Sequence, residues 1–75
     1  MKNFKVEYNV YNLTTTTTEV ESNSEYTEAE TKEEAVANVI QSLHDQALNN
    51  GHEPKIKEDK LVFENEEFLN FTATE

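Results

Sequence analysis

The sequence predicts a single acidic α+β domain over residues 1–75, in which one amphipathic helix packs on one face of an antiparallel sheet of about four strands. Three observations support this class. Apolar residues alternate near the N-terminus, a central segment carries an apolar stripe at helical spacing, and two extended segments follow Pro54. The expected order is strand, strand, helix, strand, strand. A chain of 75 residues has room for one domain only.

The first expected strand covers residues 2–13. Its apolar residues alternate strictly with polar ones, which is the pattern of a strand with one buried and one wet face. These apolar residues are Phe4, Val6, Tyr8 and Val10. The run Thr14–Thr18 that follows carries no apolar alternation. We interpret it either as a hairpin loop or as the ends of two strands.

The second expected strand runs between Val20 and Tyr26. Its glutamates share one parity, so they should form a row of carboxylates on one face of the strand. This row consists of Glu19, Glu21 and Glu25. The opposite face is expected to be the buried one, although Ser22 and Ser24 in its middle make it a weak contributor to a core.

The helix is expected to begin at Thr31. The segment Thr31-Lys32-Glu33-Glu34 is a capping box, because the threonine hydroxyl can accept the amide of the third helical residue. An apolar stripe follows, made of Val36, Val39, Ile40, Leu43 and Ala47, with Leu48 at its margin. Asn49-Asn50-Gly51 then supplies residues that tolerate a left-handed stop.

Two more extended segments follow the helix, Lys55–Glu64 and Glu67–Thr74. A turn at Glu58-Asp59 would divide the first segment, and Asn65-Glu66 is the expected turn between the two. One helix can cover only one face of the sheet. The candidates for apolar surface on the other face are Tyr11, Leu13, Val62 and Phe68. A homodimer would cover it, and apolar residues on both parities of the last two segments favour that hypothesis.

The net charge is the unusual property of this chain. Sixteen acids against six lysines and no arginine give a formal charge of −10, and residues 19–34 alone carry seven glutamates and one lysine. Such a charge opposes binding to nucleic acid and to anionic membranes. Low hydrophobicity with high charge is also typical of disorder, but the two periodic segments favour a fold.

Composition also limits the cellular compartment and the kinds of catalysis that we expect. The chain has no cysteine, and no apolar run reaches the length of a signal peptide core or a membrane span, so we expect a cytoplasmic protein. If a phage encodes it, the compartment would be the host cytoplasm. His44 and His52 are the only side chains with ordinary pKa values near neutrality, and a single glycine cannot build a phosphate cradle. We therefore expect no enzyme and no cofactor.

Metal binding is a weaker interpretation of the acids. Fourteen glutamates and two aspartates lie in spread rows, and none of them matches the twelve-residue calcium loop. A solvated surface that keeps the protein soluble explains any single glutamate well. It explains the concentration of charge in residues 19–34 less well.

The alternative is a surface that imitates DNA. Alternate residues of a strand lie about 6.6 Å apart, a repeat comparable to that of neighbouring phosphates. The candidate partner-binding residues are the strand row Glu19, Glu21 and Glu25, its extension across the helix entry through Glu28, Glu30, Glu33 and Glu34, and a second row of Glu64, Glu66 and Glu67. Two such rows could compete with DNA for a basic groove.

The acidic, arginine-free and cysteine-free chain resembles the small phage-encoded DNA-mimic and host-takeover inhibitors, a class that includes the Bacillus phage inhibitor of the nucleoid protein HU. The resemblance covers the whole chain and rests on size, charge and element order. It implies a non-enzymatic inhibitor that binds a basic DNA-binding host protein, either HU or a defence nuclease. Two other hypotheses stay open at this point: a homo-oligomeric assembly protein whose acidity serves solubility, and a weak buffer of divalent cations.

Overall fold

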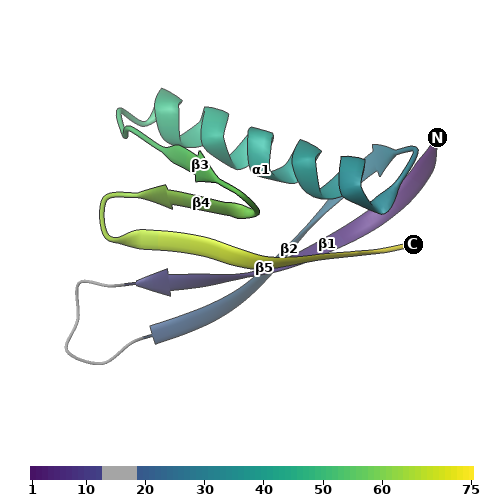
Figure 1. The fold of residues 1–75 in the computed structure, drawn as a ribbon, viewed down its shortest axis with the longest axis horizontal. Helices are drawn as coiled ribbons and strands as arrows, with labels where there is room; N and C mark the ends of the chain where they lie inside the picture. The colour runs from purple at the N-terminus through teal and green to yellow at the C-terminus, as the bar shows by residue number, and fades with distance from the viewer. Residues whose placement is uncertain (13–18) are drawn as a thin grey trace.

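The computed structural model describes residues 1–12 and 19–75, without the side chain of Glu19, and it confirms the predicted α+β class. One antiparallel sheet carries one helix on one face (Figure 1). The elements are β1 (Lys2–Asn12), β2 (Glu19–Ala29), α1 (Lys32–Asn49), β3 (Lys55–Lys57), β4 (Lys60–Phe63) and β5 (Glu66–Thr74). The order across the five-stranded sheet is β2-β1-β5-β4-β3. Two predictions lie outside the described residues: Leu13 on the uncovered face of the sheet, and the run Thr14–Thr18 as a hairpin loop or as strand ends.

The sheet has five strands instead of the expected four because Lys55–Glu64 folds back on itself. The predicted turn at Glu58-Asp59 separates β3 from β4. The turn between β4 and β5 was predicted one residue too late, since it comprises Glu64 and Asn65 and β5 begins at Glu66. In each two-residue loop the first residue has a positive φ, 52° at Glu58 and 51° at Glu64.

The face assignment of β2 differs from the prediction. Residues directly opposed across two antiparallel strands share a face. Glu25 opposes the buried Val6, and Glu21 opposes Val10. The glutamate row therefore lies on the face that carries α1, and the Ser22 and Ser24 positions lie on the face turned away from it. The prediction was wrong because α1 docks on the side of Ala29, a small and fully buried residue at the end of β2.

The predicted capping box begins the helix. Thr31 is the N-cap, and its Oγ1 accepts a hydrogen bond of 3.2 Å from the amide of Glu34. The buried helical residues are Ala35, Val39, Ile40, Leu43 and Ala47. Ala35 was not part of the predicted stripe, whereas Leu48 remains 50% exposed. Gly51 has a φ of 85°, and the amide of His52 donates to the carbonyl of Ala47 at 2.9 Å, which ends the helix.

The core lies between α1 and the centre of the sheet. Phe4, Val6 and Tyr8 of β1 supply its middle, as the alternation predicted. Leu61 of β4 and Val6 are the largest fully buried side chains. The remaining core residues are Ala29, Ala35, Val39, Leu43 and Ala73. Burial of this apolar surface is the main term that stabilises the fold.

A bulge in β5 explains its mixed pattern of apolar residues. Glu7 opposes Thr72 but Asn9 opposes Leu69, so β5 has one residue more than β1 in this interval. Asn70 takes a φ of 60° there. The bulge places both Phe68 and Phe71 on the helix side, and Phe71 stacks on Tyr8 with ring centroids 5.2 Å apart.

Phe68 was expected on the face turned away from α1, and this prediction was wrong. Phe68 opposes Val10 and packs against the core, so it lies on the helix side. The neighbouring Leu69 lies on the face turned away from α1. Apolar residues on both parities of β5 therefore do not by themselves indicate a second buried face.

Candidate acidic binding surface

The two sides of the sheet differ sharply in charge. We call the face turned away from α1 the outer face. By strand pairing its charged residues are Lys5, Lys55, Lys57, Lys60, Glu7, Glu28 and Glu67. Four lysines against three glutamates give +1, and the total charge is −10. The rest of the chain, with two lysines and thirteen acids, therefore carries −11.

The carboxylate row on β2 borders a hollow that α1 leaves uncovered. Glu21 lines this hollow of about 290 Å³ together with Glu66 of β5, which faces the helix side opposite Asn12. Its other lining residues are Val10, Asn12, Asn23 and Phe68. By register, Glu19 continues the row of Glu21 at the end of the strand. The row and Glu66 therefore approach the same open end of the sheet from two strands.

Glu25 lies where the row reaches the helix. It is half-buried and opposes Val6, and it lines a shallow hollow with Asn38 and Ser42 of α1. Burial raises the pKa of Tyr8, and the carboxylate of Glu25 raises it further. The half-burial of Glu25 and its position opposite Val6 place it at the inner end of the row.

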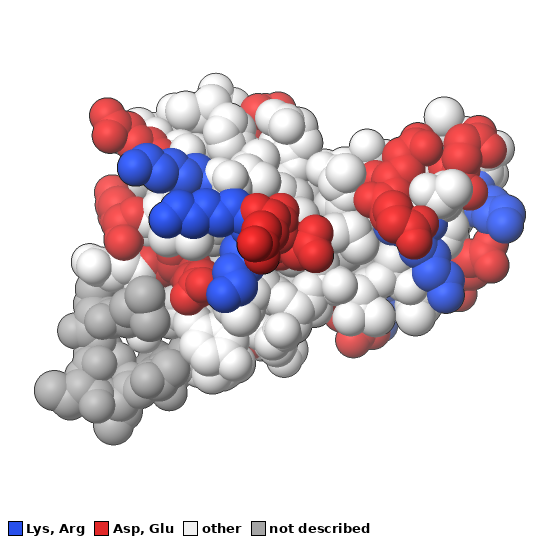
Figure 2. Space-filling view, in the orientation of Figure 1, with Lys and Arg blue, Asp and Glu red and all other residues white. Residues whose placement is uncertain are grey.

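The predicted extension through the helix entry is interrupted. Glu28 opposes Asn3 and so lies on the outer face, and the following helix-side position is the buried Ala29. Glu30, Glu33 and Glu34 form a separate group of exposed acids at the N-terminus of α1, where the helix dipole favours negative charge. Figure 2 shows acidic side chains gathered at the end of the molecule where α1 begins.

The predicted second row is wrong. Successive residues of a strand point to opposite faces, so Glu66 faces the helix side while Glu67 lies on the outer face. Glu67 also pairs with Lys60 at 3.4 Å. Glu64 lies in the turn, and its Oε1 is 2.6 Å from Nδ1 of His52. Of these three, only Glu66 joins the strand row.

One acidic group was missed in the sequence. Glu58 and Asp59 line a hollow of about 220 Å³ together with Glu33 of α1. The remaining lining residues are Val36, Ala37, Ile40, Gln41 and Ile56. Since the β3–β4 turn and the start of α1 are distant in sequence, no local pattern could have indicated this arrangement.

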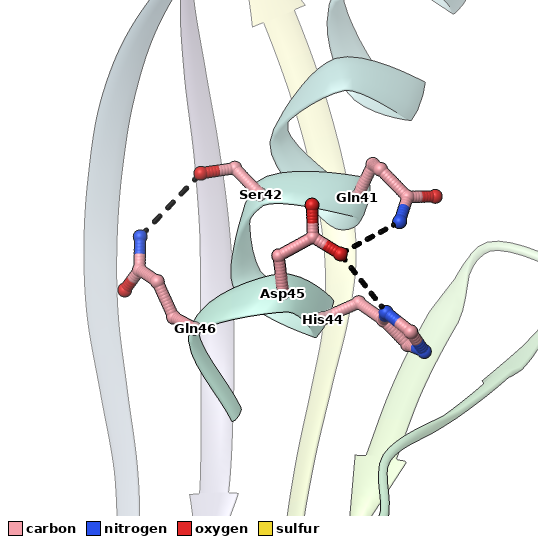
Figure 3. Close-up of polar contacts among 5 residues, drawn as sticks. All are labelled: Gln41, Ser42, His44, Asp45 and Gln46. Carbon is pink, nitrogen blue, oxygen red and sulfur yellow. Dashed lines mark hydrogen bonds and ion pairs between the residues drawn. The ribbon is translucent and has the colours of Figure 1, made fainter. Parts of the chain in front are cut away.

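Beyond its first turn, α1 carries a single acidic side chain, that of Asp45, and no lysine. Its polar side chains bond to one another: Gln41 Nε2 donates to Asp45 Oδ1 at 3.0 Å, and His44 Nδ1 lies 3.4 Å from the same oxygen. Ser42 accepts a hydrogen bond from Gln46. Ser42 and His44 point to different sides of the helix, so they do not form a nucleophile and base pair (Figure 3).

The contacts of His52 connect two parts of the fold. Its ring packs on Phe63 with centroids 5.2 Å apart, and its contact with Glu64 links the end of α1 to the β4–β5 turn. These residues line an open hollow of about 580 Å³ together with Lys55 and Lys57.

In residues 1–12 and 19–75, no three side chains of His, Asp or Glu come together in a way that could hold a metal ion. Within that part of the chain, no helix combines the length and apolar character that crossing a membrane takes. No family model, curated protein or solved structure matches the chain.

Proposed function

We propose that this protein is a non-enzymatic DNA mimic, which occupies the DNA-binding surface of a basic host protein, such as the nucleoid protein HU or a defence nuclease, and inhibits it. The observation that carries the proposal is the segregation of charge. The outer face contributes +1 to the net charge of −10, so the rest of the molecule carries −11. A basic partner is therefore attracted to the helix side and the ends of the molecule.

The strand row supplies the contacts most like a nucleic acid backbone. Glu21 and Glu25 lie on one face of β2 with Glu19 at the next position of the same parity, and Glu66 approaches them across the open hollow. A basic groove that accepts them releases the counterions it would release on binding DNA. The acids at the start of α1 form a second contact group.

The proposed partner also implies a cellular compartment and a mode of contact. A protein with this charge would work in the host cytoplasm, where its target lies, and would touch neither nucleic acid nor a membrane. The three glutamates of the helix entry, Glu30, Glu33 and Glu34, would contact basic side chains at the rim of the target's groove. Exposed ion pairs each contribute only about 0.2–1 kcal/mol, so affinity would come from many of them together.

Displacement of DNA from purified HU tests the proposal. A fluorescent DNA duplex is bound to HU, the protein is added at several salt concentrations, and release is followed by anisotropy. We expect release at low salt, and a steep loss of affinity as salt rises because several ions are released together. If the protein releases no DNA from HU, capture from bacterial lysate at low and high salt extends the test to other basic DNA-binding proteins. Failure of both experiments would overturn the proposal.

Clustered charge reversal then tests the position of the site. The site variant carries Glu→Lys changes at Glu19, Glu21 and Glu25. The control carries the changes Asp45→Lys, Glu53→Lys and Glu75→Lys, which lie outside β2 and alter the net charge equally. We expect the site variant to lose inhibition while the control retains most of it. Equal inhibition by both variants, with folding verified by circular dichroism, would show that only net charge matters.

An assembly protein is the second candidate, and one observation favours it. The outer face is almost neutral and carries apolar side chains, including the half-exposed Val20. An assembly protein would form oligomers without capturing any basic protein, and its self-association would strengthen as salt screens the repulsion. The displacement assay therefore separates the two functions.

A further inference from the structure

We propose that the outer face of the sheet is the binding surface for a second copy of this chain, giving a two-fold dimer whose sheets pack face to face and whose helices lie on the outside. This inference goes beyond the proposed function and does not depend on it. In the described structure α1 covers only the opposite face of the sheet (Figure 1).

An apolar patch lies in the part of the outer face where all five strands are present. Tyr11 opposes Val20 on one side and Glu67 on the other, and Glu67 opposes Val62. Leu69, opposite Asn9, lies in the adjacent row. Tyr11, Val20, Val62 and Leu69 thus lie within two adjacent rows across four strands, with Glu67 between Tyr11 and Val62. Val20 is 50% exposed, and the other three are half-buried.

Short uncharged side chains flank this patch, and Lys5, Glu7 and the 77% exposed Tyr26 lie farther along the same face. The outer-face positions of the three long strands beyond the patch include Ser22, Ser24, Asn9, Thr72 and Thr74. Ser22 donates a hydrogen bond to Asn9 Oδ1 at 3.2 Å, and Thr74 donates to the carbonyl of Lys5 at 3.4 Å. Short side chains that bond to the neighbouring strand of their own sheet let a second sheet approach to the usual distance of about 10 Å.

The charge of the outer face favours a second copy of this chain as its binding partner. A basic protein would be drawn to the rest of the molecule, which carries −11, and not to the outer face, which holds four of the six lysines. Two copies of an acidic chain meet with little repulsion through their near-neutral outer faces. Charges on this face are also paired within one copy: Lys5 with Glu7 at 3.6 Å and Lys60 with Glu67 at 3.4 Å.

The outer face approaches the size of a standard dimer interface. A standard interface removes about 800 Å² from each partner, and one copy exposes 5114 Å². The long strands β1, β2 and β5 alone present a flat area on the order of 500 Å², at ~4.8 Å between strands and ~3.3 Å per residue. The short strands and the relief of the side chains add to this area.

Sedimentation of matched variants tests the dimer. We expect the wild type to sediment as a dimer at micromolar concentration. Leu69→Glu places a charge in the patch, whereas Leu48→Glu makes the same change at a 50% exposed position of α1. Because a two-fold interface contains the substitution twice, Leu69→Glu should weaken the dimer by about 100-fold or more. Leu48→Glu should leave the dimer intact. A monomeric wild type, or a Leu69→Glu variant that dimerises as the wild type does, would overturn the proposal.

A second measurement keeps the test valid if Leu69→Glu does not fold. Wild-type protein is mixed from isotope-labelled and unlabelled copies, and contacts between copies are recorded by filtered nuclear Overhauser spectroscopy. We expect contacts from the methyl groups of Leu69 and Val62 to the ring of Tyr11 in the other copy. Contacts confined to α1 or to the free edge of β2 would instead place the interface elsewhere.

Discussion

The burial of Leu61 yields the sharpest prediction about stability. Leu61 is fully buried in β4, opposite Phe68 on one side and Ile56 on the other. Leu61→Ala removes about three carbon groups at ~0.8 kcal/mol each and leaves a cavity, so we expect a loss of roughly 3–5 kcal/mol in the free energy of unfolding. A domain of 75 residues has only about 4–11 kcal/mol in total. The melting temperature should fall by more than ~12 °C.

Leu48→Ala is the matched control, because Leu48 is 50% exposed on α1 and alanine is the better helix former. We expect this variant to lose less than about 1 kcal/mol. Both variants are melted at the same protein concentration and followed by circular dichroism, since a dimer makes the melting temperature depend on concentration. If the two variants lose equal stability, Leu61 does not occupy the core described here.

Three further predictions concern the helix cap, the charge and the buried tyrosine. Thr31→Ala should cost about 1 kcal/mol by removing the acceptor of the Glu34 amide, whereas Thr31→Ser should cost much less; equal losses in thermal melts would contradict the cap. Sodium chloride at about 0.5 M should raise the melting temperature because it screens a net charge of −10, and a decrease would show that ion pairs outweigh repulsion. The folded-state pKa of Tyr8 lies above its ordinary value of 10.0, so the unfolded chain loses this proton first and stability should fall as pH rises above about 10. Tyr8→Phe should reduce that fall in alkaline melts, and an unchanged pH dependence would exclude Tyr8 as its source.

Several features were determined by the sequence alone because the forces that produce them are local. Thr31 and Glu34 are three residues apart, so their cap forms wherever the helix lies. The alternation around Val6 and Tyr8 placed one face of β1 in the core, and both residues are buried. The excess of glutamate in residues 19–34 is a property of composition. These local signals also predicted the fold class and the turn at Glu58-Asp59.

The tertiary structure decided where the acids lie in space. Parity tells which residues share a face of a strand, but docking of α1 beside Ala29 decided that the row of Glu21 and Glu25 faces the helix side. The bulge at Asn70 reversed the parity within β5, which sent Phe71 inward together with Phe68. A single inserted residue exchanges the two faces of a strand because its side chains repeat every two residues.

The same dependence on distant contacts separated the acids into groups. Alternation along β5 divided Glu66 from Glu67, and strand pairing placed Glu67 beside Lys60 on the outer face. Packing of the β3–β4 hairpin against α1 brought Glu58 and Asp59 to Glu33. Composition fixes how much charge a chain carries, but the distribution of that charge over the surface depends on pairings between residues far apart in sequence, which no local pattern encodes.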